Sequence, residues 1–219
     1  MKKILIGVAL ISLIILGYYL GNLMKPKETK GGIALTLVVR QYRDGKLINE
    51  VVEKKDPFTN NFVQLLWSLM KTSGSWVTYT MTDVSGTSRN LYVSYYNDWT
   101  CAISSGYTRP LCGQGGYIYI GDGTTAFSIN DYKLSGTNIL KATCSAPSES
   151  IADPKINYTI SASFSLSSAM TINEVGYSRV LRATDAPYEF LLMRDVLSTP
   201  ISAAAGDTIT VTYIIRING

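Results

Sequence analysis

The chain has 219 residues and contains no histidine. Histidine is the usual general base for a serine or cysteine nucleophile and a common metal ligand, so its absence excludes Ser-His, Cys-His and histidine-metal mechanisms. Cysteine is also scarce, and three cysteines without histidine do not make a zinc site of the usual kind. We therefore expect the protein to use neither a metal nor another cofactor.

Charged residues make up only 16% of the chain, against about a quarter in typical soluble domains. The net charge of +4 resides entirely in residues 1–30, where five lysines face one glutamate, and the rest of the chain is neutral in sum. Nucleic-acid binding relies on clustered basic residues that neutralise phosphates. The charge balance therefore argues against a nucleic-acid partner.

Motifs of known catalytic centres are missing as well. The sequence has no Gly-x-Ser-x-Gly motif, no phosphate-binding loop ending in lysine and no suggestive pair of carboxylates. The run Gly121–Thr125 is typical of a turn, and Asp122, Asn130 and Asp131 lack the spacing of an EF-hand calcium loop. Glu174, in an apolar strand, is expected to accept hydrogen bonds from a neighbouring turn. We expect no enzymatic activity and no small-molecule substrate.

One long hydrophobic run, Ile4–Met24, stands out near the N-terminus. Its 21 residues, at about 1.5 Å each, would span about 31 Å as a helix, close to the thickness of a bilayer core. Lysines flank it on both sides. It is either an uncleaved membrane anchor or a secretory signal peptide. The predicted membrane contacts are Ile4, Leu5, Ile6, Val8, Leu10, Ile11, Leu13, Ile14, Ile15, Leu16, Tyr18, Tyr19 and Leu20.

Residues 1–30 therefore form an anchor or signal peptide with a linker, and residues 31–219 form one extracytoplasmic domain. Two β-rich runs, Ile33–Tyr42 and Leu47–Lys54, surround Asp44-Gly45, which is a strong hairpin signal. A helix is predicted to open at Asp56-Pro57, since Asp is a good N-cap and Pro fits the first helical position. Its apolar stripe consists of Phe58, Phe62, Leu65, Leu66 and Leu69, and Gly74 is its expected end.

After Gly74 the apolar residues recur with a period of two, as in strands. The predicted strands are Trp76–Val84, Leu91–Tyr96, Tyr117–Ile120, Asn138–Thr143, Ile156–Leu166, Met170–Leu181, Tyr188–Val196 and Thr208–Ile217. The last strand is expected to pair with Tyr188–Val196 across the loop Leu197–Gly206. About ten short strands predict a mostly β fold: a single β-sandwich or jelly-roll-like domain with one short helix, preceded by an N-terminal transmembrane helix.

Two covalent features are possible in an oxidising compartment. Cys101 and Cys112 flank a loop containing Gly, Pro and Ser, and a disulfide between them would contribute about 2–3 kcal/mol through loop entropy. Cys144 is then left over, either as a buried thiol or in place of one of the other two. Asn157-Tyr158-Thr159 matches the N-glycosylation pattern and lies in a predicted strand, so modification requires an outward-facing Asn157.

A series of short motifs runs through the C-terminal half: Tyr119–Thr125, Asp131–Leu134, Thr171–Tyr177, Leu191–Asp195 and Gly206–Tyr213. Their order resembles that in β-rich virion structural proteins of phages and archaeal viruses. The resemblance covers about half of the chain and implies a structural protein of a virion or of an extracellular appendage. The N-terminal anchor departs from the tailed-phage proteins of this kind. It would suit a virus with an internal membrane, or a cell-surface protein.

Three functions fit these observations. The first is a non-enzymatic, membrane-tethered component of a virion or surface assembly, in contact with the lipid bilayer and with copies of itself or another capsid protein. The second is a secreted pilus or filament subunit, in which Ile33–Tyr42 completes the sheet of the next subunit. The third is a surface module that binds a glycan or receptor through exposed aromatic residues, namely Tyr95, Tyr96, Trp99 and Tyr107.

Overall fold

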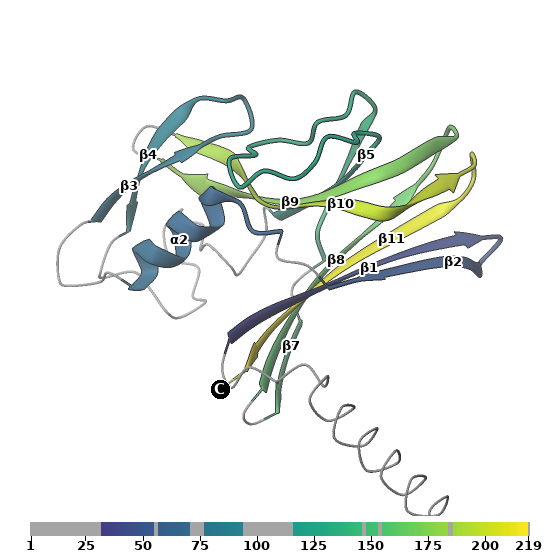
Figure 1. Ribbon diagram of the computed structural model, residues 1–219, viewed down its shortest axis with the longest axis horizontal. Helices are drawn as coiled ribbons and strands as arrows, with labels where there is room; N and C mark the ends of the chain where they lie inside the picture. The colour runs from purple at the N-terminus through teal and green to yellow at the C-terminus, as the bar shows by residue number, and fades with distance from the viewer. Residues whose placement is uncertain are drawn as a thin grey trace, which may run out of the picture. The chain divides into compact units, whose positions relative to one another are not determined.

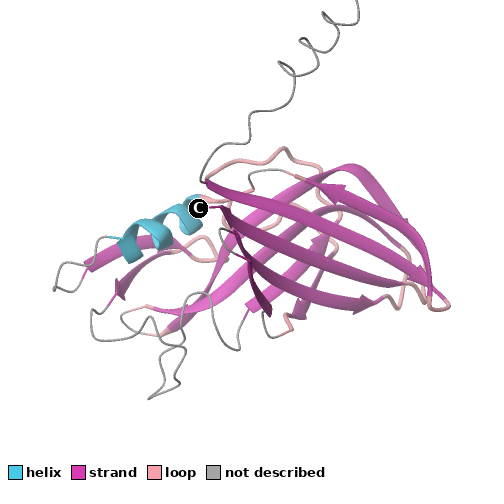
Figure 2. Ribbon diagram, turned by 90° about the horizontal axis from the view of Figure 1, so that it is seen from below, coloured by secondary structure: helices cyan, strands magenta, loops and turns pink. Residues whose placement is uncertain are grey.

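The structure, a computed structural model, describes residues 32–54, 57–70, 77–93, 116–145, 148–152, 155–183 and 186–218. The described residues from Ile33 to Asn218 belong to one compact unit. They are mostly β, with eleven strands and one helix, α2. Figure 2 shows the strands in magenta and the helix in cyan. Within these ranges no helix is long and apolar enough to cross a membrane, and Ile4–Met24 lies outside them.

The strands form three sheets (Figure 1). The largest has the order β2-β1-β11-β8-β7, the second has the order β10-β9-β5-β6, and β3 and β4 form a separate hairpin. The elements are β1 (Gly32–Arg43), β2 (Lys46–Glu53), α2 (Asn60–Met70), β3 (Val77–Thr82), β4 (Ser88–Val93), β5 (Gly116–Gly121), β6 (Ile139–Thr143), β7 (Ser148–Ala152), β8 (Lys155–Ser165), β9 (Met170–Arg182), β10 (Pro187–Ala203) and β11 (Thr208–Asn218).

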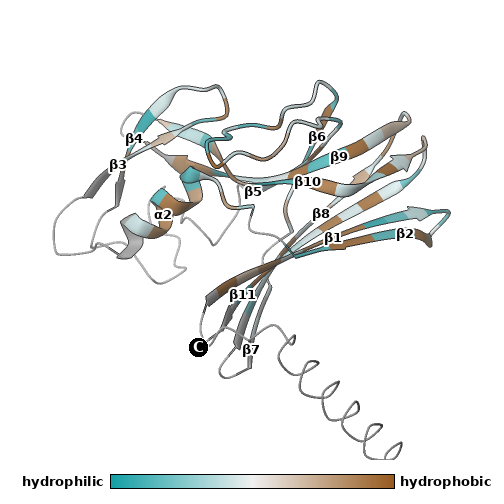
Figure 3. Cartoon of the chain, viewed as in Figure 1, coloured by the Kyte–Doolittle hydropathy of each residue, from teal (hydrophilic) through white to brown (hydrophobic). Residues whose placement is uncertain are grey.

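One hydrophobic cluster joins both large sheets, the helix and the β3–β4 hairpin. It is built by the alternation of the strands, as along β11, where Ile209, Val211, Tyr213 and Ile215 are buried and the residues between them are more exposed. In the middle of β9 and β10 both faces are buried, from Glu174 to Arg179 and from Phe190 to Asp195. Figure 3 shows the apolar bands along β9 and β10 and on α2.

The first predicted hairpin is confirmed. β1 pairs antiparallel with β2, and Asp44 and Gly45 form the turn between them with φ angles of 51° and 75°. A two-residue turn of this kind needs positive φ at both positions, which Asp and Gly adopt at low cost. The turn therefore sets the first pairs of the hairpin, and the register then shifts between Tyr42 and Gln41. On its other side β1 lies next to β11.

The predicted partner of the last strand is wrong. β11 pairs with β8 over its whole length, from Thr208 opposite Ser165 to Asn218 opposite Lys155, while β10 pairs with β9. The turn after Ala203 carries the chain from one large sheet to the other, so consecutive strands are not neighbours here.

β10 is also longer than predicted. Pro200 suggests a strand end because proline cannot donate a backbone hydrogen bond. The pairing of β10 with β9 instead shifts register between Val196 and Ile201 and then resumes as far as Ala203. An irregularity in an edge strand is where a sheet can accept proline.

The predicted start of the helix is wrong as well, because α2 begins at Asn60 rather than at Pro57. Before the helix, residues 57–59 pair with the free edge of β10. The amide of Arg194 donates to the carbonyl of Pro57 (3.0 Å), and the amide of Thr59 donates to the carbonyl of Leu192 (3.0 Å). Thr59 also donates its hydroxyl to Leu191 (2.8 Å) instead of capping the helix. Asp56 and Gly74 lie outside the described residues.

Candidate functional site

A buried ion pair lies at the centre of the second sheet. Arg194 of β10 and Glu174 of β9 project from the same face, and their side chains are 1% and 0% exposed. Nε and Nη2 of Arg194 lie 2.8 and 2.7 Å from Oε2 of Glu174. A buried charge pair is tolerated when its remaining donors and acceptors are also satisfied. Both residues meet this condition through the loop that joins β5 to β6, residues 122–138.

Arg194 holds this loop through several atoms. Its Nη1 lies 2.6 Å from Oδ2 of Asp131, and its Nη2 donates to the carbonyl of Thr125 (2.8 Å) and to Oγ of Ser135 (2.9 Å). The planar guanidinium group, with five donors, is suited to such multiple contacts. The loop is thereby fixed on the outer face of β9 and β10.

Glu174 fixes the far side of the same loop. It accepts hydrogen bonds from the backbone amides of Ser135 (3.1 Å) and Gly136 (2.7 Å). The prediction that Glu174 accepts hydrogen bonds from a neighbouring turn is confirmed. The motifs quoted above for the C-terminal half thus contribute Asp131, Glu174 and Arg194 to a single cluster, which we call the loop clamp.

Glycine is required where the loop closes on itself. A Cβ atom on Gly123 would lie 2.2 Å from Oε1 of Glu174 and 2.5 Å from the backbone nitrogen of Gly136. The loop is further tied by Asp122, whose carboxylate accepts from the amides of Thr137 (2.9 Å) and Asn138 (3.1 Å). The hydrogen bond from Asn138 is the main cause that lowers the pKa of Asp122. The Gly-rich run is therefore needed for close backbone packing.

The three residues with oxygen atoms that could bind calcium form hydrogen bonds or ion pairs with other parts of the protein instead. Asp122 binds the loop backbone, Asp131 binds Arg194, and Asn130 accepts a hydrogen bond from Asn60 at the start of α2 (2.9 Å). In the described part of the chain, no three His, Cys, Asp or Glu side chains are grouped so as to hold a metal ion.

Helix α2 is joined to the loop as well as to the sheets. The amide of Asn60 donates to the carbonyl of Ile129 (2.7 Å). Asn61 donates its side-chain amide to the carbonyls of Thr82 (2.8 Å) and Leu191 (3.1 Å), and its oxygen accepts from the amide of Thr82 (3.0 Å). The helix is thus held between the loop, β3 and β10.

An open apolar groove of about 400 Å³ results from this arrangement. It lies between the first residues of β1, the helix and the loop. Its lining, which defines the apolar groove below, consists of Ile33, Phe58, Phe62, Val63, Leu66, Phe127 and Ile129. Ile33, Val63 and Ile129 are nearly half exposed, at 46%, 46% and 49%. Large apolar side chains gathered in one exposed recess are typical of a contact surface.

The inner wall of the apolar groove consists of two stacked aromatic rings. Phe58 and Phe62 stack with their ring centroids 4.1 Å apart, and Phe62 is buried in the main core. The predicted apolar stripe of the helix is confirmed for Phe62 and Leu65, which are 4% and 1% exposed. Val63 lines the apolar groove next to Phe62 but is more exposed, and Trp67, one helical turn after Val63, is 44% exposed.

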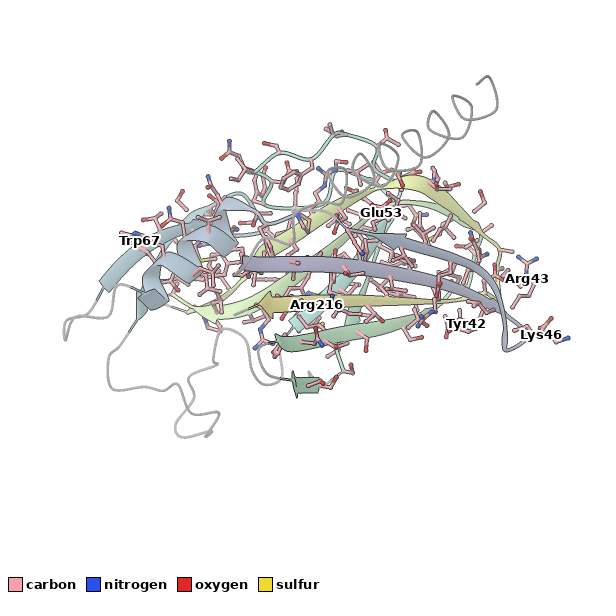
Figure 4. All side chains as sticks on the ribbon, turned by 60° about the horizontal axis from the view of Figure 1, so that its bottom comes forward. Tyr42, Arg43, Lys46, Glu53, Trp67 and Arg216 are labelled. Atoms are coloured by element: carbon pink, nitrogen blue, oxygen red, sulfur yellow. The ribbon has the colours of Figure 1, made fainter. Side chains whose placement is uncertain are left out.

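A second cluster of charged residues lies beside the β1–β2 turn. Asp207, which is 1% exposed, accepts hydrogen bonds from Arg43 (2.8 and 3.0 Å), Gln41 (2.7 Å) and the amide of Ala204 (2.8 Å). The hydrogen bond from Arg43 is the main cause that lowers the pKa of Asp207. This cluster, the turn clamp, explains the Gly-Asp pair before β11. Figure 4 shows Tyr42, Arg43 and Lys46 at this end of the domain and Trp67 at the other.

The remaining predicted site residues are distributed as follows. Cys144 is a free thiol, and burial raises its pKa to about 12, so it is not a reactive thiolate at neutral pH. Asn157 lies half-buried in β8, where its Oδ1 accepts a hydrogen bond from Nε of Arg216 (2.9 Å). The membrane segment, Cys101, Cys112 and the four aromatic residues from Tyr95 to Tyr107 lie outside the described residues.

Sequence reasoning missed the apolar groove. Phe127 and Ile129 are apolar residues in a polar, Gly-rich loop, which was the available signal, but only the loop's polar residues were considered. Comparisons of the chain with protein-family models, with curated proteins and with solved structures found no match in any of the three.

Proposed function

We propose that the protein is a non-enzymatic structural component of a virion or surface assembly, tethered to a membrane by its N-terminal segment. In this proposal Ile4–Met24 remain attached as a transmembrane helix, and the two packed sheets form a β-sandwich or jelly-roll-like domain outside the cytoplasm. The domain assembles with copies of itself or with a capsid protein.

The loop clamp is the observation that supports this proposal. Three residues from the motifs that resemble virion proteins bind one another or the loop. Glu174 accepts hydrogen bonds from Arg194 and from the loop amides, and Arg194 also binds Asp131. A catalytic acid or base needs access to a substrate. Side chains that are 1% and 0% exposed and hydrogen-bonded within the domain serve to fix its shape.

The alternative function, a filament subunit, requires that β1 pair with the sheet of a neighbouring subunit. Assembly by strand addition needs a sheet that lacks a strand until a neighbouring subunit supplies it. Here β1 lies in its own sheet between β2 and β11, and Leu35, Leu37 and Val39 are buried in the core. This arrangement favours a domain that is complete by itself.

The test is the intact mass of the protein from its native source, combined with flotation on a density gradient. We expect a mass near the full 24.0 kDa and co-flotation with lipid. A mass lower by about thirty residues, with the protein in the aqueous fraction, would show cleavage of a signal peptide and would overturn the tether. A secreted filament subunit or a secreted binding module would then replace it.

A further inference from the structure

We propose that the apolar groove is the face with which the domain rests on the bilayer that anchors it. The occupant is the boundary between lipid headgroups and acyl chains, which takes up the exposed groove residues Val63, Phe127 and Ile129, together with the exposed Trp67 one helical turn after Val63. The inference rests on the proposed tether and adds to it an orientation and a lipid-binding surface.

The position of the apolar groove in the chain is the first reason. Ile33 lines it, and only eight residues, 25–32, separate Ile33 from Met24, the last residue of the apolar segment. At ~3.3–3.6 Å per residue, this linker reaches about 30 Å at most. A tethered domain therefore has its apolar groove near the membrane surface. β1 extends from Ile33 towards the β1–β2 turn. At about 3.3 Å per residue, the ten residue steps from Ile33 to Arg43 cover about 33 Å, so that turn lies far from the apolar groove.

The chemistry of the apolar groove is the second reason. All seven lining side chains are apolar, and helix α2 contains no Asp, Glu, Lys or Arg. Its exposed side carries Val63 and, one turn later, Trp67. Tryptophan favours the membrane interface because its ring is apolar and its N–H reaches a polar partner. Among the described residues of this surface, none that would enter the interface carries a charge.

The charges nearby in sequence fit a lipid surface too. Lys25, Lys27 and Lys30 lie in the linker that leads to Ile33. Basic residues next to a membrane segment attract anionic headgroups, at about 1 kcal/mol each near the surface. Meanwhile Arg194, Glu174 and Asp131 hold the loop from behind, so that Phe127 and Ile129 are presented without a charged neighbour in the lining.

The experiment uses the full chain in liposomes that contain anionic lipid and lipids brominated on the acyl chain. Trp76→Phe and Trp99→Phe leave Trp67 as the single fluorophore. Because an interfacial helix lies ~5–10 Å deep, we expect the bromines to reduce Trp67 emission roughly by half. The matched control, Trp67→Phe with Leu47→Trp in the same background, moves the fluorophore to the exposed end of β2 and should keep its emission.

A second variant separates the apolar groove from the tether. Val63→Asp with Ile129→Asp should abolish the quenching of Trp67 while the protein still floats with the liposomes. Hydrogen exchange of the unsubstituted chain, which needs no tryptophan replacement, should show slower exchange in Asn60–Met70 when the chain is in liposomes than when it is in detergent.

The outcomes are distinct. If the protein floats but Trp67 is not quenched and hydrogen exchange is unchanged, the apolar groove does not contact lipid. The membrane tether would still stand. Crosslinks between the apolar grooves of two copies would also overturn it, with a second copy as the occupant. Failure to float would overturn the proposed function, and this inference would fall with it.

Discussion

The loop clamp and the turn clamp each hold a buried carboxylate, but their cations differ. Glu174 is 0% exposed and faces Arg194, whose side chain is 1% exposed. Asp207 is 1% exposed and faces Arg43, whose side chain is 51% exposed. If the pair is broken, Arg43 can return to water, whereas Arg194 and Glu174 cannot. The arginine–carboxylate pair is therefore a much stronger structural constraint in the loop clamp than in the turn clamp.

The two clamps also hold different parts of the domain in place. The loop clamp positions Phe127 and Ile129 and so shapes the apolar groove, while the turn clamp joins β1 to the turn that precedes β11. The predictions below test this contrast, from the largest expected effect on stability to the smallest.

Arg194→Met should lower the free energy of unfolding by about 3–5 kcal/mol, because it leaves the Glu174 charge buried with no cation beside it. Chemical denaturation measures the loss. Arg43→Met is the matched control and should cost far less, since Arg43 is half exposed. Addition of Glu174→Gln to Arg194→Met should recover part of the loss. Equal losses for the two arginine variants would contradict the contrast between the clamps.

Gly123→Ala should cost about 1–3 kcal/mol, because the new methyl group must displace Glu174 and the backbone of Gly136. Thermal unfolding measures this effect. Gly45→Ala is a comparison without a steric clash, since no atom lies within 4 Å of the Cβ position. An alanine there is still strained by the φ angle of +75°. A Gly123→Ala protein as stable as the parent would mean that the loop does not close as described.

Asp207→Asn should destabilise the protein at neutral pH by less than Gly123→Ala, and the deficit should shrink in acid. The pKa of Asp207 is lower in the folded protein than in the unfolded chain, so its contribution is full above pH ~4 and is lost as the pH falls. Denaturation at a series of pH values below neutral measures the gap. Asp44→Asn, at the exposed turn, is the control. A gap that widens in acid would contradict the sign.

Acid should also weaken the β3–β4 hairpin. Burial opposes the ionisation of Asp83, but hydrogen bonds from Ser85 and Arg89 outweigh it and lower the pKa of Asp83 to about 2. The contribution of Asp83 is therefore present above pH ~4 and is lost as the pH falls toward about 2. The hydrogen-exchange protection factors of residues 77–93, which compare the exchange rate with that of an unfolded chain at the same pH, should fall over this range, and Asp83→Asn should make them less dependent on pH.

Ile129→Asp should change stability least, by about 0.5 kcal/mol or less, because Ile129 is 49% exposed. Its carbonyl still accepts the hydrogen bond from Asn60, which is a backbone contact. A thermal melt beside that of the parent protein checks this. A large loss would mean that Ile129 belongs to the core and that the apolar groove is closed in solution.

The strands could be predicted from sequence because alternation follows directly from half-burial. Thr208–Ile217 alternates regularly, and its structure matches. β7 was missed because Ser148–Ala152 contains one β-branched residue and no clear alternation. The partner of β11 could not be predicted, since the turn at Ala204–Asp207 leads into the opposite sheet, and sequence proximity carries no information on that choice.

The loop clamp was only partly predictable. Glu174 stood out as an acid in an apolar strand, which indicates a buried carboxylate that needs donors. Arg194 gave no comparable signal, because its partners Thr125, Asp131 and Ser135 are contributed by a loop more than fifty residues earlier. For the apolar groove the sequence offers one signal, the apolar Phe127 and Ile129 in a polar loop. The groove itself could not be predicted, since its three segments meet only after folding: Ile33, α2 and residues 127–129.

The β1–β2 turn has a practical consequence. Gly45 has open space around it, and Leu47 and Ile48 beside it are about half exposed, at 52% and 48%. Exposed loop tips of this kind are where inserted peptides are best tolerated. An epitope placed between Asp44 and Gly45 would avoid both the apolar groove and the loop clamp. An antibody bound to it would mark the end of the domain opposite Trp67 (Figure 4) in electron micrographs.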